Sequence, residues 1–418
     1  MKTVIILGAG ASVEFFEKYK GNYLSTQALT KALSEDLDDL YNYLITNRIY
    51  DEKRIPFIKE FVTEVVLSLR KYFKDTYNFE HIIHIVDILV DIFTSKNLII
   101  RDNKNKLTNN IYLPLLDIFG TKFESYWGDI LYYLPVYIRY FILDYVNKFL
   151  LKFRHYYDKT DFEIWKNFLL KLLNEGEVSI FSLNYDILLY EVIAELNKEN
   201  KNNEKLYIET GVNFEDLALN NGCDILDLEK IKAAKNVFVP IHGSTLFVPE
   251  NNNVKICRNA NWATEERLRI ITSMQVTSEG CNDYNQVMIT GLSKFDALSK
   301  EPFATFYIRL IKDLIEANRI FVIGYSGADK HLNMLLKSSF CNVSEIHNIT
   351  KLNEKEYGNL LDNLSEHIFS DWRKFLPENC FKKENLNQII SDKIIMKDGC
   401  YIYPKGTKYF LNNLEMLI

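Results

Sequence analysis

The sequence predicts an α/β fold in which a parallel β-sheet is interrupted, after its first strand, by a large inserted helical subdomain. In the second half of the chain, short apolar runs rich in β-branched residues alternate with segments of helical periodicity. Between about residues 26 and 175 helical periodicity prevails. With 418 residues, 47% of them hydrophobic, the chain is long enough to bury a large core.

The first strand is predicted at residues 2–8, where a continuous apolar run ends in glycine. In the helical insertion, segments such as 58–73 carry apolar residues at i, i+3, i+4 and i+7. Later strands are expected at 178–183, 237–241, 319–323 and 344–349. Further helices are expected between residue 186 and about residue 198, at 302–317 and from about residue 328 onward. A hairpin is expected around Asp398-Gly399.

We divide the chain into residues 1–345, which hold this sheet and the insertion, and a C-terminal α+β extension, 346–418, which is a candidate for assembly. The net charge of −6 gives no whole-chain sign of nucleic-acid binding. The first residues lack a signal-peptide pattern, and the apolar stretch 130–138 is far shorter than the roughly 20 residues of a membrane span. We therefore expect a cytoplasmic protein that has no membrane contact and keeps its cysteines as thiols.

Polar residues follow four of the predicted strands, at the point where each strand ends. The endings read GAGAS at 8–12, NYD at 184–186, HGS at 242–244 and GYS at 324–326. In open α/β sheets ligands bind beyond the carboxyl ends of the strands, so the endings together predict a binding site. The first ending resembles the G-x-G-x-x-G turn of dinucleotide-binding folds, but Val13 replaces the third glycine and residues 24–34 contain no acidic residue. The pattern typical of hydride-transfer enzymes is therefore absent.

The first two endings each have a functional and a structural explanation. Gly8 and Gly10 let the backbone approach a phosphate at a helix N-terminus, with Ser12 as a further donor, or they serve only a tight strand-to-helix turn. Asn184 and Asp186 place an amide and a carboxylate beside a ligand, or they cap the next helix.

The last two endings likewise each have a functional and a structural explanation. His242, with the small Gly243 beside it, is suited to exchange a proton near neutral pH, or it is a structural histidine. After the fourth strand, Asp329 can accept hydrogen bonds from ribose hydroxyls, or it caps the next helix, as Ser326 also can.

Taken in order, GAGAS, SLNYD, IHGS and IGYSGAD resemble the sirtuin-like NAD-consuming domain found in bacterial anti-phage defence proteins. Stretches 24–33, 289–294 and 301–303 are similar as well, and the resemblance covers roughly residues 1–345. It implies a Rossmann-like parallel sheet with a helical second lobe and NAD in the cleft between them. Sirtuin deacetylases carry a zinc module with two close cysteine pairs, whereas no two of the six cysteines here lie within four positions of each other. The resemblance therefore implies the NAD-hydrolysing branch, with NAD as substrate and no metal.

The resemblance also implies roles for the residues at the strand ends. Asn184 would lie by the nicotinamide ribose, Asp186 near the carboxamide, and His242 by the ribose hydroxyls as the base. The turn at 8–12 would hold the pyrophosphate, and the residues after the fourth strand would line the adenosine side. The implied NAD contacts are Gly8, Ala9, Gly10, Ala11, Ser12, Thr26, Gly243, Gly324, Tyr325, Ser326 and Asp329.

The function that this resemblance predicts is NAD glycohydrolysis, which releases nicotinamide and leaves ADP-ribose or a cyclic product. NAD depletion would then serve anti-phage defence. The alternative is a non-hydrolytic NAD or nucleotide sensor, or a regulatory subunit of a defence complex. The implied partners are further copies of the chain and a defence protein, either a HerA-type ATPase or an Argonaute-type protein.

Overall fold

The structure of the chain, a computed structural model, falls into two compact units. The sheet unit contains Met1–Asn22, Leu150–Ser244 and Pro302–Ile418, and the helical unit contains Tyr23–Phe149 and Thr245–Glu301. The residues that the structure describes are 1–16, 26–35, 37–47, 53–74, 77–94, 134–153, 159–213, 222–250, 253–274, 287–289, 298–340, 343–352, 372–376, 386–390, 393–396 and 399–414.

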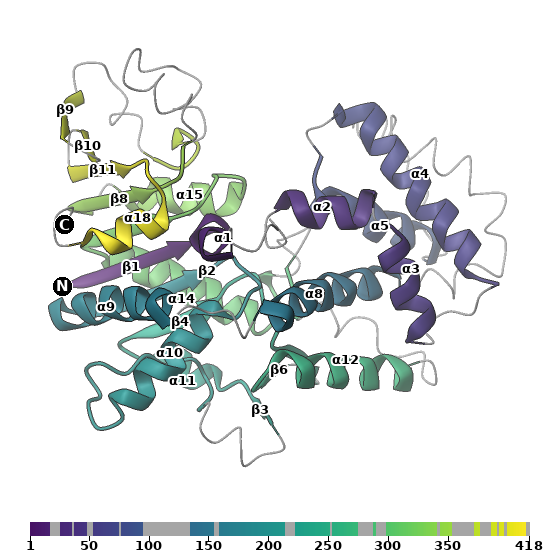
Figure 1. Ribbon diagram of the computed structural model, residues 1–418, viewed down its shortest axis with the longest axis horizontal. Coiled ribbons are helices and arrows are strands. Elements are labelled where there is room, and N and C mark those ends of the chain that lie inside the picture. Colours follow the sequence, from purple (N-terminus) through teal and green to yellow (C-terminus); the bar gives the residue numbers. More distant parts are fainter. Residues whose placement is uncertain are drawn as a thin grey trace. The chain divides into compact units, whose positions relative to one another are not determined.

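The sheet unit is built on an eight-stranded sheet with the order β4-β2-β1-β7-β8-β11-β10-β9 (Figure 1). The strands are β1 (Lys2–Leu7), β2 (Glu177–Ser182), β4 (Val237–Pro240), β7 (Arg319–Ile323), β8 (Glu345–Ile349), β9 (Leu386–Ile390), β10 (Lys393–Met396) and β11 (Cys400–Tyr403). All pairs from β4 through to β11 are parallel, whereas β10 is antiparallel to both its neighbours. The predicted Rossmann-like α/β fold is confirmed.

Strand β1 lies inside the parallel part of the sheet, between β2 and β7. Its six residues, KTVIIL, are all buried. A strand covered on both faces has no solvent side on which polar residues would be favoured. This explains why the sequence reads as a continuous apolar run rather than as an alternating one.

The helices of the sheet unit cover this sheet, and aromatic side chains join two of them to it. They are α1 (Gly10–Phe16), α9 (Lys159–Glu175), α10 (Leu188–Glu199), α11 (Leu228–Ala233), α14 (Phe303–Glu316), α15 (Lys330–Ser339) and α18 (Thr407–Asn412). Phe168 of α9, Phe321 of β7 and Phe410 of α18 have ring centroids 5.4 to 6.2 Å apart. The C-terminal helix is therefore part of the core of this unit.

The C-terminal segment continues the sheet and returns to its beginning. Strand β11 pairs in parallel with β8, and the backbone N–H of Lys408 in α18 donates to Oε2 of Glu14 in α1 at 2.8 Å. The hydroxyl of Thr407 lies 3.3 Å from the carbonyl oxygen of Gly10, to which it donates. Residues on both sides of the predicted boundary between residues 345 and 346 thus lie in one sheet.

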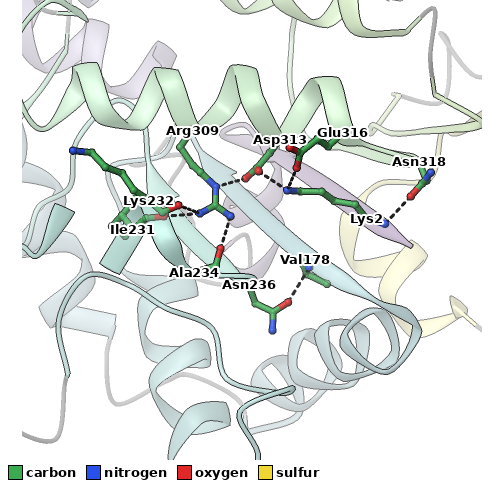
Figure 2. Close-up of polar contacts among 10 residues, drawn as sticks. All are labelled: Lys2, Val178, Ile231, Lys232, Ala234, Asn236, Arg309, Asp313, Glu316 and Asn318. Atoms are coloured by element: carbon green, nitrogen blue, oxygen red, sulfur yellow. Dashed lines mark hydrogen bonds and ion pairs between the residues drawn. The ribbon is translucent and has the colours of Figure 1, made fainter. Parts of the chain in front are cut away.

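A cluster of buried charges joins the start of β1 to α14 and α11 (Figure 2). Nζ of Lys2 lies 2.5 Å from Oδ1 of Asp313 and 2.8 Å from Oε2 of Glu316. Nε of Arg309 lies 2.6 Å from the other oxygen of Asp313. The guanidinium also donates to the carbonyl oxygens at the end of α11, those of Ile231, Lys232 and Ala234. Burial lowers the pKa of Lys2, but the hydrogen bonds to Asp313 and Glu316 outweigh it, so that this pKa is raised.

The helical unit contains most of the predicted helical insertion. Its elements are α2 (Thr26–Ser34), α3 (Leu37–Thr46), α4 (Ile55–Phe73), α5 (Phe79–Thr94), α8 (Leu134–Phe153, which ends beyond the boundary of the unit), α12 (Ala260–Met274), β5 (Phe247–Glu250) and β6 (Asn253–Cys257). Strands β5 and β6 form an antiparallel hairpin. Among the described helices, none combines the length and the apolar character that a membrane crossing requires.

The helical unit has a buried polar centre. Nη2 of Arg267, in α12, lies 2.6 Å from Oδ1 of Asp144, in α8, and both side chains are at most 3% exposed. Nη1 of Arg267 donates to the carbonyl oxygens of Thr245 and Phe247, at 2.9 Å each, and the hydroxyl of Tyr43 donates to Asp144. This ion pair therefore holds the stretch of chain that directly follows the HGS motif.

Candidate functional site

The four polar endings converge because their strands are neighbours in the sheet. The order β4-β2-β1-β7 is parallel throughout, and Leu7 is in register with Ser182 on one side and with Ile323 on the other. Ser182 is in turn paired with Pro240 at the end of β4. The carboxyl ends of all four strands therefore meet at one edge of the sheet, which is where ligands bind in folds of this kind.

The turn from β1 into α1 packs against the turn that follows β7. The backbone N–H of Gly8 donates to the carbonyl oxygen of Ile323 at 2.9 Å, and that of Gly10 donates to the carbonyl oxygen of Gly324 at 3.0 Å. The N–H groups of the next two residues donate to carbonyl oxygens within the turn. The sequence led us to expect free N–H groups for a phosphate at this helix N-terminus. The four N–H groups of Gly8, Gly10, Ala11 and Ser12 are instead used within the backbone.

The close approach of these two turns requires glycine. A Cβ on Gly8 would lie 2.5 Å from the carbonyl oxygen of Gly324, and a Cβ on Gly10 would lie 2.9 Å from the Cα of Gly324. A Cβ on Gly324 would lie 2.1 Å from the backbone nitrogen of Ala11, and Gly324 has φ +64°. Packing alone therefore explains these glycines, as the structural interpretation of GAGAS expects.

We predict that Gly324→Ala lowers the free energy of unfolding by about 2–4 kcal/mol. The left-handed φ costs an alanine about 1 kcal/mol, and forcing a methyl group against the backbone of the other turn adds about 1–3 kcal/mol. Urea denaturation followed by circular dichroism measures the change. Ala328→Ser, at an exposed position in the same loop, is the control and is expected to stay within about 0.5 kcal/mol of the parent. Equal stability of the Gly324 variant and the control would contradict the packing argument.

Asn184, Ser12 and Asp186 form a hydrogen-bonded chain across two of the endings. The amide nitrogen of Asn184 donates to the carbonyl oxygen of Gly8 at 3.0 Å and to Oγ of Ser12 at 3.1 Å. The hydroxyl of Ser12 is in turn hydrogen-bonded to the carboxyl group of Asp186. Residues that the sequence places 172 positions apart are thus joined directly.

Asp186 is buried and also supports the start of α10. Its Oδ1 accepts the backbone N–H of Leu188 at 3.0 Å. Burial raises the pKa of Asp186 above its ordinary value, and the hydrogen bonds from Leu188 and Ser12 oppose that shift. This hydrogen bond supports the interpretation that Asp186 caps the next helix.

His242 lies in the neighbouring ending, and its partner is Asp329. His242 and Asn184 each come two residues after the paired Pro240 and Ser182. Nε2 of His242 lies 3.0 Å from Oδ2 of Asp329, and these two side chains are 6% and 5% exposed. The sequence offers no sign of this pairing, because the two residues are 87 positions apart.

The remaining predicted contacts are in different surroundings. Tyr325 is buried, and its hydroxyl oxygen accepts the backbone N–H of Asp329 at 3.1 Å. Ser326 is exposed, and Asp329 rather than Ser326 caps α15. Thr26 is an exposed residue at the start of α2, in the helical unit. Of the further similar stretches, residues 24–25 and 290–294 lie outside the described residues.

Sequence reasoning missed two polar residues that support this edge. Ser182, the last residue of β2, accepts the backbone N–H of Asn184 on its Oγ at 3.1 Å. Asn333, in α15, accepts the hydroxyl proton of Tyr325 at 2.7 Å. Neither comes directly after a predicted strand, which was the signal that singled out most of the other candidates.

The cysteines and the potential metal-binding side chains of the described residues form no second candidate site. Within the part of the chain that the structure describes, no group of three or more His, Cys, Asp or Glu residues is placed to hold a metal ion. Cys223 and Cys257 are disulfide-bonded, so the expectation that all six cysteines are thiols is wrong for these two. The candidate site therefore consists of the strand-end residues.

The edge of the sheet thus combines an amide, a buried carboxylate and an imidazole–carboxylate pair. The imidazole of His242 is a group that can accept a proton near neutral pH. The side-chain oxygen of Asn184 accepts no hydrogen bond from the described residues, so it is available to a hydroxyl group or a water molecule. The arrangement suits a reaction in which a hydroxyl group is oriented and then deprotonated.

Comparisons of the chain with known proteins do not identify a family. No protein-family model matches it. No curated protein matches it either. The resemblance to sirtuin-like domains therefore rests on the four motifs and on their arrangement.

Proposed function

We propose that the chain binds NAD at the carboxyl edge of β1, β2, β4 and β7 and cleaves the bond between nicotinamide and ribose. The observation that carries the proposal is the placement of His242 and Asn184 at the ends of two neighbouring, in-register strands. Neighbouring strands lie about 4.8 Å apart, so both side chains come from positions close enough to serve one ligand. A buried imidazole and an amide oxygen at neighbouring strand ends fit a sugar hydroxyl group or a water molecule better than they fit an apolar ligand.

In this proposal the two residues have separate tasks. The side-chain oxygen of Asn184 accepts a hydrogen bond from the attacking water or from a ribose hydroxyl and so orients it. His242 takes a proton from that water or hydroxyl. The glycosidic bond breaks, its electron pair neutralises the pyridinium nitrogen, and nicotinamide leaves. The water oxygen bonds to C1′ of the ribose, which yields ADP-ribose and one proton.

Asp186 and the GAGAS turn support the site in this proposal. Asp186 is joined to Asn184 through Ser12, so it orients the amide and the serine hydroxyl. The turn at 8–12 places α1 beside β7 through its glycines. The resemblance to anti-phage proteins is the support for a role of this reaction in defence by NAD depletion.

A non-hydrolytic nucleotide sensor is the second candidate. It is favoured by one observation: both amide hydrogens of Asn184 are used inside the protein, toward Gly8 and Ser12, which is a structural use of that residue. A sensor would need the same edge of the sheet but no proton acceptor.

An assay for nicotinamide release tests the proposal. The purified chain is incubated with NAD, alone and together with the product of a neighbouring gene, and products are separated by chromatography with mass detection. We expect one nicotinamide for each NAD consumed, together with ADP-ribose or a cyclic product. Saturable NAD binding by calorimetry without nicotinamide in either condition would overturn the hydrolase and favour the sensor. Absence of both binding and turnover would overturn both.

A further inference from the structure

We infer that Asp329 is a positioning residue that sets the tautomer of His242, with the proton of the neutral ring on Nε2. The inference gives a specific role to the contact between Oδ2 of Asp329 and Nε2 of His242, which is 3.0 Å long and lies between two nearly inaccessible side chains. A carboxylate only accepts hydrogen bonds, so the imidazole must donate from Nε2. In the neutral ring the other nitrogen then carries the lone pair.

Asp329 divides its two oxygens between two tasks. Its Oδ1 accepts the backbone N–H groups of His331 and Leu332, at 3.0 and 3.2 Å, and so caps α15. Its Oδ2 faces His242. Because the helix holds one oxygen, the carboxylate cannot rotate freely, and the second oxygen is aimed at the imidazole.

A tyrosine and an asparagine hold the backbone on which Asp329 sits. The hydroxyl oxygen of Tyr325 accepts the N–H of Asp329 at 3.1 Å, and the hydroxyl donates to Oδ1 of Asn333 at 2.7 Å. Nδ2 of Asn333 donates to the carbonyl oxygen of Gly327 at 2.8 Å. The turn after β7 is thus closed at both ends, and Asp329 is placed by hydrogen bonds rather than by exposed, mobile contacts.

This assignment changes the chemistry expected of the site. A ribose-binding carboxylate would present an oxygen to the ligand, whereas both oxygens of Asp329 are engaged inside the protein. A carboxylate that faces Nε2 also stabilises the imidazolium that forms when the ring takes up a second proton, because the positive charge then lies beside a negative one. For catalysis the inference rests on the proposed NAD cleavage, whereas the tautomer itself does not depend on it.

The test uses Asp329→Asn in the full chain. The asparagine side-chain oxygen still accepts the N–H groups of α15, since Asn caps helices as well as Asp does. Its amide now presents N–H to Nε2 of His242, so the neutral imidazole must accept there and carry its proton on Nδ1. Asp227→Asn is the matched control: Asp227 caps α11 by accepting the N–H of Lys230 at 3.0 Å, and that bond lies at an exposed site.

Two measurements separate this inference from the proposed function. Nitrogen-15 NMR of the histidine-labelled chain, with the His242 signals assigned from His242→Gln, reports which ring nitrogen is protonated. We expect Nε2–H in the parent and in Asp227→Asn, and Nδ1–H in Asp329→Asn. In the nicotinamide assay, Asp329→Asn should lower kcat by roughly 10²- to 10⁴-fold with KM for NAD nearly unchanged, as the loss of a carboxylate that orients a catalytic histidine does elsewhere.

The outcomes are distinguishable. Nδ1–H at His242 in the parent chain, or no change of tautomer in a folded Asp329→Asn, overturns the inference whatever the activity. A parent chain with Nε2–H that cleaves no NAD overturns the proposed function and leaves the assignment of Asp329 intact. Should Asp329→Asn fail to fold, the spectrum of the parent chain still decides.

Discussion

Replacing His242 with glutamine is expected to lower the rate of nicotinamide release by about 10²- to 10⁴-fold, the usual contribution of a general base. Glutamine keeps an N–H donor that reaches toward Oδ2 of Asp329, so the buried carboxylate retains a partner. It cannot accept a proton at neutral pH. The variant therefore separates the chemistry from the packing, and the same assay, run with NAD at saturating concentration, measures the loss.

His242→Ala is the less specific variant of this pair. It leaves Oδ2 of Asp329 without its imidazole partner in a nearly inaccessible place, which we expect to cost about 1–3 kcal/mol of stability. A glutamine variant with the parent's rate would exclude His242 as the base. A glutamine variant that is inactive but as stable as the parent is the expected result.

Asn184 needs a different interpretation from the one that the sequence alone favoured. An alanine there removes the donors to Gly8 and Ser12, so lost activity would be accompanied by a looser turn. The structure thus makes His242, rather than Asn184, the residue whose replacement reports on the chemistry.

Replacing Asp313 with alanine is expected to lower the free energy of unfolding by about 3–5 kcal/mol, the cost of leaving buried charges without their partner. Figure 2 shows the carboxylate between Lys2 and Arg309. Asp313 is fully buried, with 0% of its side chain exposed, and the two cations are 10% and 3% exposed. Without it, two positive charges face each other across β1 and α14. Urea denaturation followed by circular dichroism measures the change.

Glu316→Ala is the matched control for this prediction. Glu316 also contacts Lys2, but its side chain is 48% exposed, and solvent-exposed ion pairs contribute little to stability. Because the pKa of Lys2 is raised above its ordinary 10.5, the pairing stabilises the fold below that pH and its contribution fades as the pH rises through the folded-state value. Asp313→Ala should remove much of this alkaline dependence. If the two variants lose the same free energy of unfolding, burial is not the reason for the large contribution of Asp313 to stability.

The strand-end motifs were the most informative part of the sequence. Largely apolar runs predicted the strands β1, β2, β4 and β7 to within about two residues, and these strands are confirmed. The reason is physical: a strand covered on both faces needs apolar residues at every position, and that pattern can be read without knowing the fold. The strand expected at 344–349, which contains polar residues, is also present, as β8. The hairpin predicted near the C-terminus is also present, as β10 and β11.

The partition of the helices was harder to predict. Residues 26–175 read as one helical block, yet α9 belongs to the sheet unit, where Phe168 meets Phe321. Helical periodicity shows that a helix has an apolar face but does not show what that face contacts.

The amino-acid pattern was enough to predict a mostly parallel α/β sheet with polar residues where its strands end, because burial and turn chemistry act on neighbouring residues. Which strands lie side by side and which polar groups pair became known from the folded chain. The contact between His242 and Asp329 and the chain from Asn184 through Ser12 to Asp186 each join residues that are distant in sequence. Such pairs leave no local pattern, because their geometry depends on the order of the strands. The glycines of the first turn illustrate the difference. Their sequence pattern indicated a phosphate-binding turn, whereas in the folded chain they pack against the backbone of the turn after β7.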